Sequence, residues 1–465
     1  MRRTHWKRYR LKCTALACVM ALSACSSVNF EDSVARTNKD LATFTQGHLE
    51  LAASDEQRAA RLGAANDLLS KPLGQAGATQ LALVNSPSLQ VLLSQNWAEA
   101  AGAAQYGRIS NPTLSFERST LLDEVELNRR LSFGLLDLLT LPLRYQSSQR
   151  AIAKAQSQLA SDVVDHITLV RQAWVQAVAA QQALELARQQ SDLAQASAEM
   201  AKRMQAAGNF SKLDRLRHQA LYADAASQLA MASNEANASR EALVRALGLT
   251  QEQAARLVLP KRLPDLPKSP REANDVSANA VTNRLDVGLA QANWEAVGKS
   301  RSAEWMSTFT DAEVAVRRDT VSNSADGSNN SRQGYEIAIK LPLFDWGGMR
   351  REALDAQTLA AGNRLEATLR NASSNLRESY VAYRTAYDLA MHFRTEVLPL
   401  RKAISEETVL RYNGMFVGVF DLLADAREQV ATVAAAINAE KQFWLADAAL
   451  QSTVIGRPIN TGSQP

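Results

Sequence analysis

The sequence predicts a mainly α-helical fold with a small β part, built from two tandem copies of one unit. Three observations predict it: segments that match at a steady offset, long helical stretches without Pro or Gly, and short segments of alternating polarity. With 465 residues, 46% of them hydrophobic and 22% charged, the chain is long enough for several domains and too apolar to be disordered.

The duplication rests on three pairs of segments that match in the same order: 88–95 with 284–291, 131–144 with 337–350, and 208–214 with 415–421. The offset between partners grows from 196 to 206 and 207 across the polar segment 322–331. This growth predicts a longer loop in the second copy.

Each copy is expected to begin with one helix and two strands. The helices are predicted at Thr79–Tyr106 and Val281–Arg301. Tyr335, Ile337 and Ile339 alternate with polar or small residues, as in a strand with two different faces. The same alternation marks the segments around 114–116 and 314–316, and a less clean one marks 127–135, where Arg129 falls on the apolar face.

Long helices follow the strands. Arg144–Gln205 contains neither Pro nor Gly, and large apolar residues recur there in steps of three, four or seven. A helix of about 60 residues is about 90 Å long, which no single globular core requires, so coiled-coil packing is predicted. In the first copy this long helix is expected to be followed by a turn at Gly208-Asn209 and a return helix at Ser211–Leu247. In the second copy the long helix is expected at Arg350–Tyr412, the turn at Asn413-Gly414 and the return helix at Val419–Ile455.

The first 24 residues are predicted to be a signal peptide: a basic stretch precedes an apolar run of twelve residues, too short to span a bilayer. Leu22-Ser-Ala-Cys25 resembles a bacterial lipobox, which implies cleavage before Cys25, attachment of palmitate and other acyl chains there, and outer-membrane sorting. The alternative is a secreted protein with a chance cysteine. The expected divisions are 1–24 signal peptide, 25–78 N-terminal segment, 79–248 first repeat, 249–280 linker, 281–456 second repeat and 457–465 tail.

Composition argues against several classes of function. Removal of the six basic residues of the signal leaves 46 basic and 48 acidic residues, a formal charge of −2 that gives no reason to bind nucleic acid. The five histidines form no i,i+4 pair, so no metal site is predicted. No catalytic constellation and no cofactor motif is found, so the chain is not expected to be an enzyme.

The number of predicted strands indicates a channel made of several subunits. Four strands cannot close a barrel, and an open sheet edge in lipid leaves backbone groups unsatisfied. At least about eight strands are required, so several subunits must share one barrel. The same subunits contribute their long helices to a tube.

Residues 335–350 and 411–423 strongly resemble TolC-like outer-membrane efflux proteins, and the resemblance runs from about residue 80 to 456. It implies a homotrimer in which four strands per subunit form a shared transmembrane β-barrel and the long helices form an α-barrel. It further implies a lipid-anchored exit duct with a long periplasmic part, working with a periplasmic adaptor and an inner-membrane efflux pump.

The resemblance also implies a gate at the helix tips. Asp421 falls on an acidic ring position, while the second acidic position falls on Ala424, with Asp425 one residue out of phase. Asp214 and Tyr412 fall on positions that resemble a linking pair. The tip glycine of the second copy is replaced by Met415. The alternative interpretation is that Asp214 and Asp421 only cap or charge their helix N-termini.

Two other classes remain open. A coiled-coil structural lipoprotein accounts for the helices and the lipid but not for the paired strands. A periplasmic adaptor needs a larger β-rich part than this chain offers. The transported cargo is not predicted.

Overall fold

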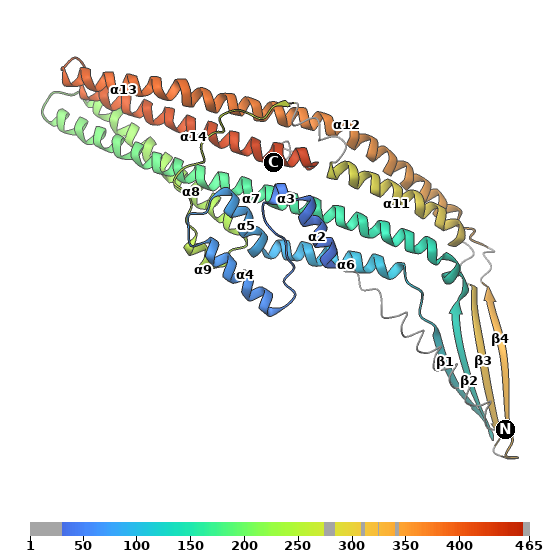
Figure 1. The fold of residues 1–465 in the computed structure, drawn as a ribbon. Helices are drawn as coiled ribbons and strands as arrows, with labels where there is room; N and C mark the ends of the chain where they lie inside the picture. Colours follow the sequence, from blue (N-terminus) through green and yellow to red (C-terminus); the bar gives the residue numbers. More distant parts are fainter. Residues whose placement is uncertain (1–29, 274–283, 308–311, 324, 340–343, 459–465) are drawn as a thin grey trace. The chain divides into compact units, whose positions relative to one another are not determined.

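The computed structural model describes residues 30–273, 284–307, 312–323, 325–339 and 344–458 (Figure 1). The predicted signal peptide, the lipidation site Cys25, Val281 and the end of the linker lie outside the described residues, as does most of the C-terminal tail. The described chain forms two compact units. The strand unit contains 95–156 and the described residues of 1–36 and 292–360; the helical unit contains the described remainder.

The helices and strands follow one another in a repeated order (Figure 1). Among the described residues, no helix combines the length and the apolar character that crossing a bilayer requires. The elements are α2 (Phe30–Asp40), α3 (Ala42–Thr45), α4 (Asp55–Leu68), α5 (Gln75–Asn85), α6 (Pro87–Tyr106), β1 (Thr113–Leu121), β2 (Glu124–Gly134), α7 (Leu135–Ala206), α8 (Lys212–Leu247), α9 (Gln251–Arg256), α11 (Leu285–Ser307), β3 (Ala312–Asn323), β4 (Asn329–Ile339), α12 (Gly348–His392), the π-helical turn η1 (Phe393–Val397), α13 (Leu398–Asn413) and α14 (Val419–Ile455).

Predicted helix boundaries were wrong in both copies. In the second copy, the first helix ends at Ser307 rather than Arg301. The single helix Thr79–Tyr106 is two helices, because Pro87 disfavours helical geometry at Ser86, which has ψ 118° and ends α5. The first long helix starts at Leu135 rather than Arg144 and contains Pro142. The apolar stretch after β2 thus continues directly into α7. Segment 30–78, the described part of the predicted N-terminal segment, holds α2, α3, α4 and the start of α5.

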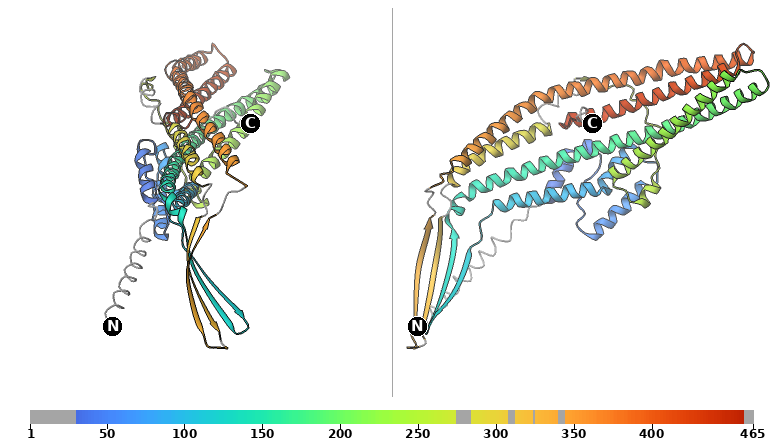
Figure 2. Two further views of the ribbon diagram at one scale, coloured as in Figure 1. Left: turned by 90° about the vertical axis from the view of Figure 1, so that its right-hand side faces the viewer. Right: turned by 180° about the vertical axis from the view of Figure 1, so that it is seen from behind.

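The strand unit holds one four-stranded antiparallel sheet in the order β1-β2-β3-β4 (Figure 2). The hairpin of each copy is a neighbouring pair, and β2 joins β3 across the duplication with Leu131 opposite Val316. One sheet therefore combines strands from both copies. The mainly α fold with four strands is confirmed.

Arg144 anchors the start of α7 within the strand unit. Its guanidinium donates to the backbone oxygens of Tyr106 and Arg108 at 3.0 and 2.7 Å, and it pairs with Asp137 at 3.1 Å. These contacts fix the end of α6 and the segment before β1 against α7. Arg144 therefore joins the segment that leads into β1 to the start of the helix that follows β2.

In the helical unit, the N-terminal segment is held against α7 by buried polar contacts. Trp174 donates its indole N–H to the carbonyl of Leu73 at 2.7 Å. Arg171 donates to the carbonyl of Phe44 and lies over the Phe44 ring, with its guanidinium carbon 4.3 Å from the ring centroid. Because Arg171 and Trp174 are almost completely buried, these bonds satisfy polar groups that water does not reach.

The described linker packs on α12 through tyrosines. Tyr387 donates its hydroxyl to the carbonyl of Pro267 at 3.1 Å, and Tyr380 donates to that of Arg271 at 3.2 Å. Tyr383 accepts from the N–H of Arg271 at 3.1 Å. The same tyrosines pack with Phe443 in a buried cluster. The proline-rich linker is therefore fastened along α12.

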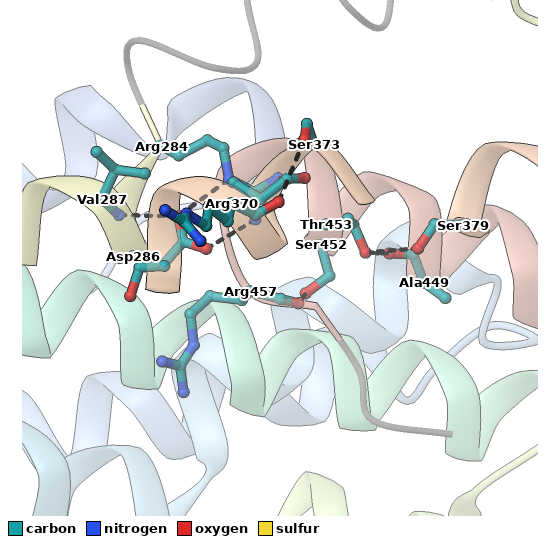
Figure 3. A network of polar contacts seen from close by, with 12 residues as sticks. Arg284, Asp286, Val287, Arg370, Ser373, Ser379, Ala449, Ser452, Thr453 and Arg457 are labelled. Atoms are coloured by element: carbon teal, nitrogen blue, oxygen red, sulfur yellow. Dashed lines mark hydrogen bonds and ion pairs between the residues drawn. The ribbon is translucent and has the colours of Figure 1, made fainter. Parts of the chain in front are cut away.

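Each copy closes where the end of its last helix meets the start of its first. Gly248 ends α8 with φ +65°, and an added Cβ would lie 2.2 Å from Pro87. Gly456 ends α14 with φ +102°, and an added Cβ would lie 2.6 Å from Asp286. Beside this second closure, the fully buried Arg284 side chain pairs with Asp286 at 2.7 Å (Figure 3). The duplication thus extends to the glycines that permit close backbone approach.

Candidate functional site at the turns of the helical hairpins

The two helical hairpins, α7–α8 and α13–α14, end in turns of the same geometry. In the first, Gly208 has φ +79°, and Asn209 donates its N–H to the carbonyl of Met204 at 2.9 Å. In the second, Met415 has φ +61°, and Phe416 donates to the carbonyl of Arg411 at 2.9 Å. This bond over five residues, with a left-handed residue inside it, is a Schellman cap.

Met415 therefore occupies the left-handed position of the second turn that Gly208 occupies in the first. The predicted turn residue Asn413 is the last residue of α13, and Gly414 follows it with φ −78°. An added Cβ on Gly414 would lie 2.8 Å from the Phe416 ring, so a larger residue there would require that exposed ring to move. Methionine at this position makes the left-handed conformation less favourable than glycine would, but the backbone follows the same turn.

The acidic residues predicted for the gate lie in the first turns of the two return helices. Ser211 caps α8: its hydroxyl accepts from the N–H of Asp214 at 3.1 Å and donates to the Asp214 carboxylate at 2.6 Å. Asp421 accepts from the N–H of Gly418 at 2.9 Å. Both carboxylates therefore stabilise a helix N-terminus, as the alternative interpretation expected, and this role is compatible with a gate.

The predicted link between Asp214 and Tyr412 stays a prediction. The ion-pair partner of Asp214 among the described residues is Arg217, at 3.4 Å. The Tyr412 side chain is 38% exposed. Asp421 is exposed as well. These groups are therefore accessible to solvent in the single chain.

An aromatic cluster that the sequence did not reveal joins the two hairpins. Phe210, from the first turn, stacks on Phe420 of α14 with ring centroids 4.7 Å apart, and His218 of α8 lies 4.5 Å from Phe420. His218 is also hydrogen bonded to the Ser197 hydroxyl at 2.9 Å. Burial, and secondarily the nearby Arg427, lower the pKa of His218, while Asp214 opposes the shift. We call Phe210, His218 and Phe420 the aromatic clasp.

Asp425, the acid one residue out of phase, is occupied inside the second hairpin. Its carboxylate accepts from Arg401 at 2.7 Å, and the two side chains are 9% and 15% exposed. Arg401 also donates to the backbone oxygen of Asp425 at 2.7 Å. Because the Asp425 carboxylate is buried in this ion pair, it is not available for the acidic ring predicted at the helix tips. The structure therefore leaves Asp421 as the accessible acid of this helix turn.

Sequence reasoning located the turns and both first-turn acids but missed the aromatic clasp and the Arg401–Asp425 pair. Arg401 and Asp425 are 24 positions apart, and Phe210 and Phe420 are 210 apart, so no local spacing indicates either contact. Within the described residues, no group of three or more His, Cys, Asp or Glu is placed to hold a metal ion.

The architecture is that of known outer-membrane channels. The chain matches the outer membrane protein VceC of Vibrio cholerae with a TM-score of 0.63 and 15% identity, over 85% of this chain and 96% of that one. It matches the Campylobacter jejuni CmeC outer membrane channel with a TM-score of 0.65 and 15% identity, over 86% and 87%. The fold of this chain is therefore that of TolC-like outer-membrane channels, and the predicted resemblance is confirmed at the level of the fold.

A sequence relative gives a second line of similarity. The chain is 27% identical over 288 residues to the cobalt-zinc-cadmium resistance protein CzcC of Cupriavidus metallidurans, over 59% of this chain. The match spans 64% of the length of CzcC. No protein-family model matches the chain. VceC is described as an outer membrane protein, CmeC as an outer membrane channel and CzcC as a resistance protein.

Proposed function

We propose that the chain is one subunit of a homotrimeric outer-membrane channel, the passive exit duct of a tripartite efflux system. In this proposal it works with a periplasmic adaptor and an inner-membrane pump, and a lipid on Cys25 anchors it. The single observation that carries the proposal is the open, two-faced sheet of the strand unit.

The sheet has two unpaired edges. Among the described residues, β1 pairs only with β2, and β4 pairs only with β3. The outer N–H and C=O groups of β1 and β4 therefore lack strand partners, and such groups are costly in hydrocarbon. Pairing β4 of one copy with β1 of the next removes both edges, and three copies of a four-stranded sheet make a barrel of ordinary size.

The two faces of the sheet suit lipid on one side and water on the other. Leu114, Phe116, Tyr335, Ile337 and Ile339 lie on one face and are exposed. The opposite face carries ion pairs, such as Arg130 with Glu313 and with Glu336, each at 3.2 Å. We call these the apolar face and the polar face. Apolar outside and polar inside is the pattern of a membrane barrel.

For the gate, we propose that Asp421 of three copies meets at the periplasmic end of the tube. Its support is an exposed carboxylate in the first turn of α14, on a position that resembles the acidic ring. Three like charges in a narrow pore repel one another and attract cations. Asp421→Ala is expected to raise the conductance of the resting channel, measured in planar bilayers, relative to the wild type.

The control for the gate is Asp214→Ala, which removes the matching helix-terminal acid of the first copy. If both substitutions raise conductance equally, the effect comes from looser helix ends and not from a ring at Asp421. If neither changes conductance while the tube forms, the gate lies elsewhere.

The assembly itself is tested by extracting the full-length protein in mild detergent, measuring its mass and imaging it. Trimers that insert into bilayers and conduct are expected. Compact monomers without conductance would favour the other candidate, a coiled-coil structural lipoprotein.

The relative CzcC, whose name describes resistance to cobalt, zinc and cadmium, suggests divalent metal ions as cargo. A passive pore needs no ligand cluster for such cargo, because the pump selects it. Deletion of the gene is expected to lower the tolerated concentration of these ions. Unchanged metal tolerance, with increased sensitivity to organic drugs, would contradict the metal assignment.

A further inference from the structure

Three arginines lie on the apolar face of the sheet. Strand pairing places Arg129 of β2 directly opposite Arg318 of β3, and places Arg118 of β1 opposite Leu127, two residues from Arg129 on the same face. We call Arg118, Arg129 and Arg318 the arginine cluster.

No acidic residue of the described strands shares this face. By the same pairing, the acids of the strands all lie on the polar face: Glu117, Glu124, Glu126, Glu313, Asp319 and Glu336. There they serve other arginines, since Arg130 pairs with Glu313 at 3.2 Å and Arg317 pairs with Asp319 at 2.8 Å. On the polar face Arg130 and Arg317 are thus paired with acids, whereas the apolar face of the described strands offers its arginines no acid.

The arginine cluster is electrostatically unfavourable without an anion. Like charges directly opposite each other on neighbouring strands destabilise a sheet. Within the described residues, these guanidinium groups make a weak hydrogen bond, from Arg129 to the Thr320 hydroxyl at 3.4 Å. A phosphate between Arg129 and Arg318 offers each guanidinium a charged acceptor of matching geometry.

The position of the cluster along the strands indicates which anion it meets. Nearest the helices, the apolar face carries rows such as Phe133–Val314–Ile337 and Leu114–Leu131–Val316–Tyr335. The next row, Phe116–Arg129–Arg318–Gln333, holds the two opposed arginines. Beyond Arg118 and Leu127, towards the hairpin turns, the row Thr120–Val125–Ser322–Asn329 is mainly polar. Successive rows lie about 6.6 Å apart, at two residues each.

This order repeats the profile of half a bilayer, in which hydrocarbon is followed by charged headgroups and then by water. We propose that the arginine cluster binds the phosphate groups of an anionic lipid at the membrane surface around the hairpin turns. The inference rests on the proposed function, because it requires the apolar face to lie in the membrane. It assigns to the sheet a lipid-binding role in addition to forming the channel wall.

The test uses the full-length protein in a neutral detergent, with binding of lipopolysaccharide followed by native mass spectrometry. The probes are intact lipopolysaccharide, the same lipid after removal of its phosphates, and inorganic phosphate. The variants are Arg318→Gln and the pair Arg129→Gln with Arg318→Gln. The matched control is Arg332→Gln, one strand away on the polar face.

Arg318→Gln is expected to weaken binding of the intact lipid by about tenfold, the worth of one charge-assisted contact, and the double variant is expected to weaken it further. Two comparisons show whether the arginine cluster and the phosphate cause the binding. The control Arg332→Gln should bind the intact lipid like the wild type. The dephosphorylated lipid should bind weakly to every variant. Equal loss in Arg332→Gln would overturn the proposal, because it would show attraction to overall charge. Inorganic phosphate binding as well as the lipid would also overturn it.

Conductance in bilayers of uncharged lipid separates this inference from the proposed function. If wild type and variants all conduct but bind lipopolysaccharide equally, the channel stands and the lipid site fails. If the wild type does not insert or conduct, the proposed function fails first.

Discussion

The two helical hairpins follow the same path but are held together by different chemistry. At the offset of 207 that relates the tips, His218 of the first hairpin corresponds to Asp425 of the second. His218 bonds to the Ser197 hydroxyl within the aromatic clasp, whereas Asp425 forms a buried ion pair with Arg401. The left-handed turn position is Gly208 in one and Met415 in the other.

This comparison shows that duplication preserved backbone geometry while the interior contacts diverged. Backbone bonds over five residues are 2.9 Å long in both turns. The side-chain contacts near the turns differ: the first hairpin has the hydrogen bond between His218 and Ser197, and the second has the salt bridge between Asp425 and Arg401. The second hairpin should therefore be the more vulnerable to loss of a single partner, because an isolated buried charge is costlier than an isolated hydroxyl partner.

The largest expected effect comes from Arg401→Leu. The substitution leaves the Asp425 carboxylate buried without its cation, and we expect it to destabilise the protein by about 3 kcal/mol. Thermal unfolding followed by circular dichroism at neutral pH measures the loss. The matched change in the first hairpin, Ser197→Ala, removes one hydrogen bond and should cost about 1 kcal/mol.

A second variant separates the charge from the packing. Replacing Arg401 and Asp425 together by leucine removes both charges, and most of the lost stability should return. A double variant as unstable as Arg401→Leu alone would mean that side-chain packing, not the unpaired carboxylate, holds the second hairpin.

How far the sequence predicted these features depends on the range of the interactions. Alternating residues such as Tyr335 and Ile337 are a local signal, and the strands were found from them. Helix boundaries were less accurate: the break at Pro87 and the early start of α7 at Leu135 were missed, since the helix start after β2 does not follow from periodicity alone. The clasp and the Arg401–Asp425 pair required the packing of helices, which no motif indicates.

An intermediate effect is expected at the turns. Met415 adopts a left-handed conformation that costs most residues about 1 kcal/mol, and its side chain is 94% exposed, so little packing is lost on truncation. We therefore expect Met415→Gly to stabilise the protein by about 1 kcal/mol. The measurement is again the shift of the unfolding transition.

Gly208→Ala is the reciprocal change, because an added Cβ there meets nothing within 4 Å and the backbone strain acts alone. It should destabilise by about 1 kcal/mol. Changes of the same sign in the two turns would show that they are not equivalent.

The smallest effect concerns pH and only the first hairpin. Burial and Arg427 lower the pKa of His218, so as pH falls through about 6.5 the unfolded chain takes up its proton before the folded one does. The stability contributed by this histidine is therefore complete above about pH 6.5 and decreases below it. We expect the wild type to lose more stability than His218→Gln when the pH falls from 7.5 to 5.5, as measured by thermal unfolding of both at each pH. Because the comparison cancels the other titrating groups, equal losses in the two proteins would place the acid sensitivity outside the aromatic clasp.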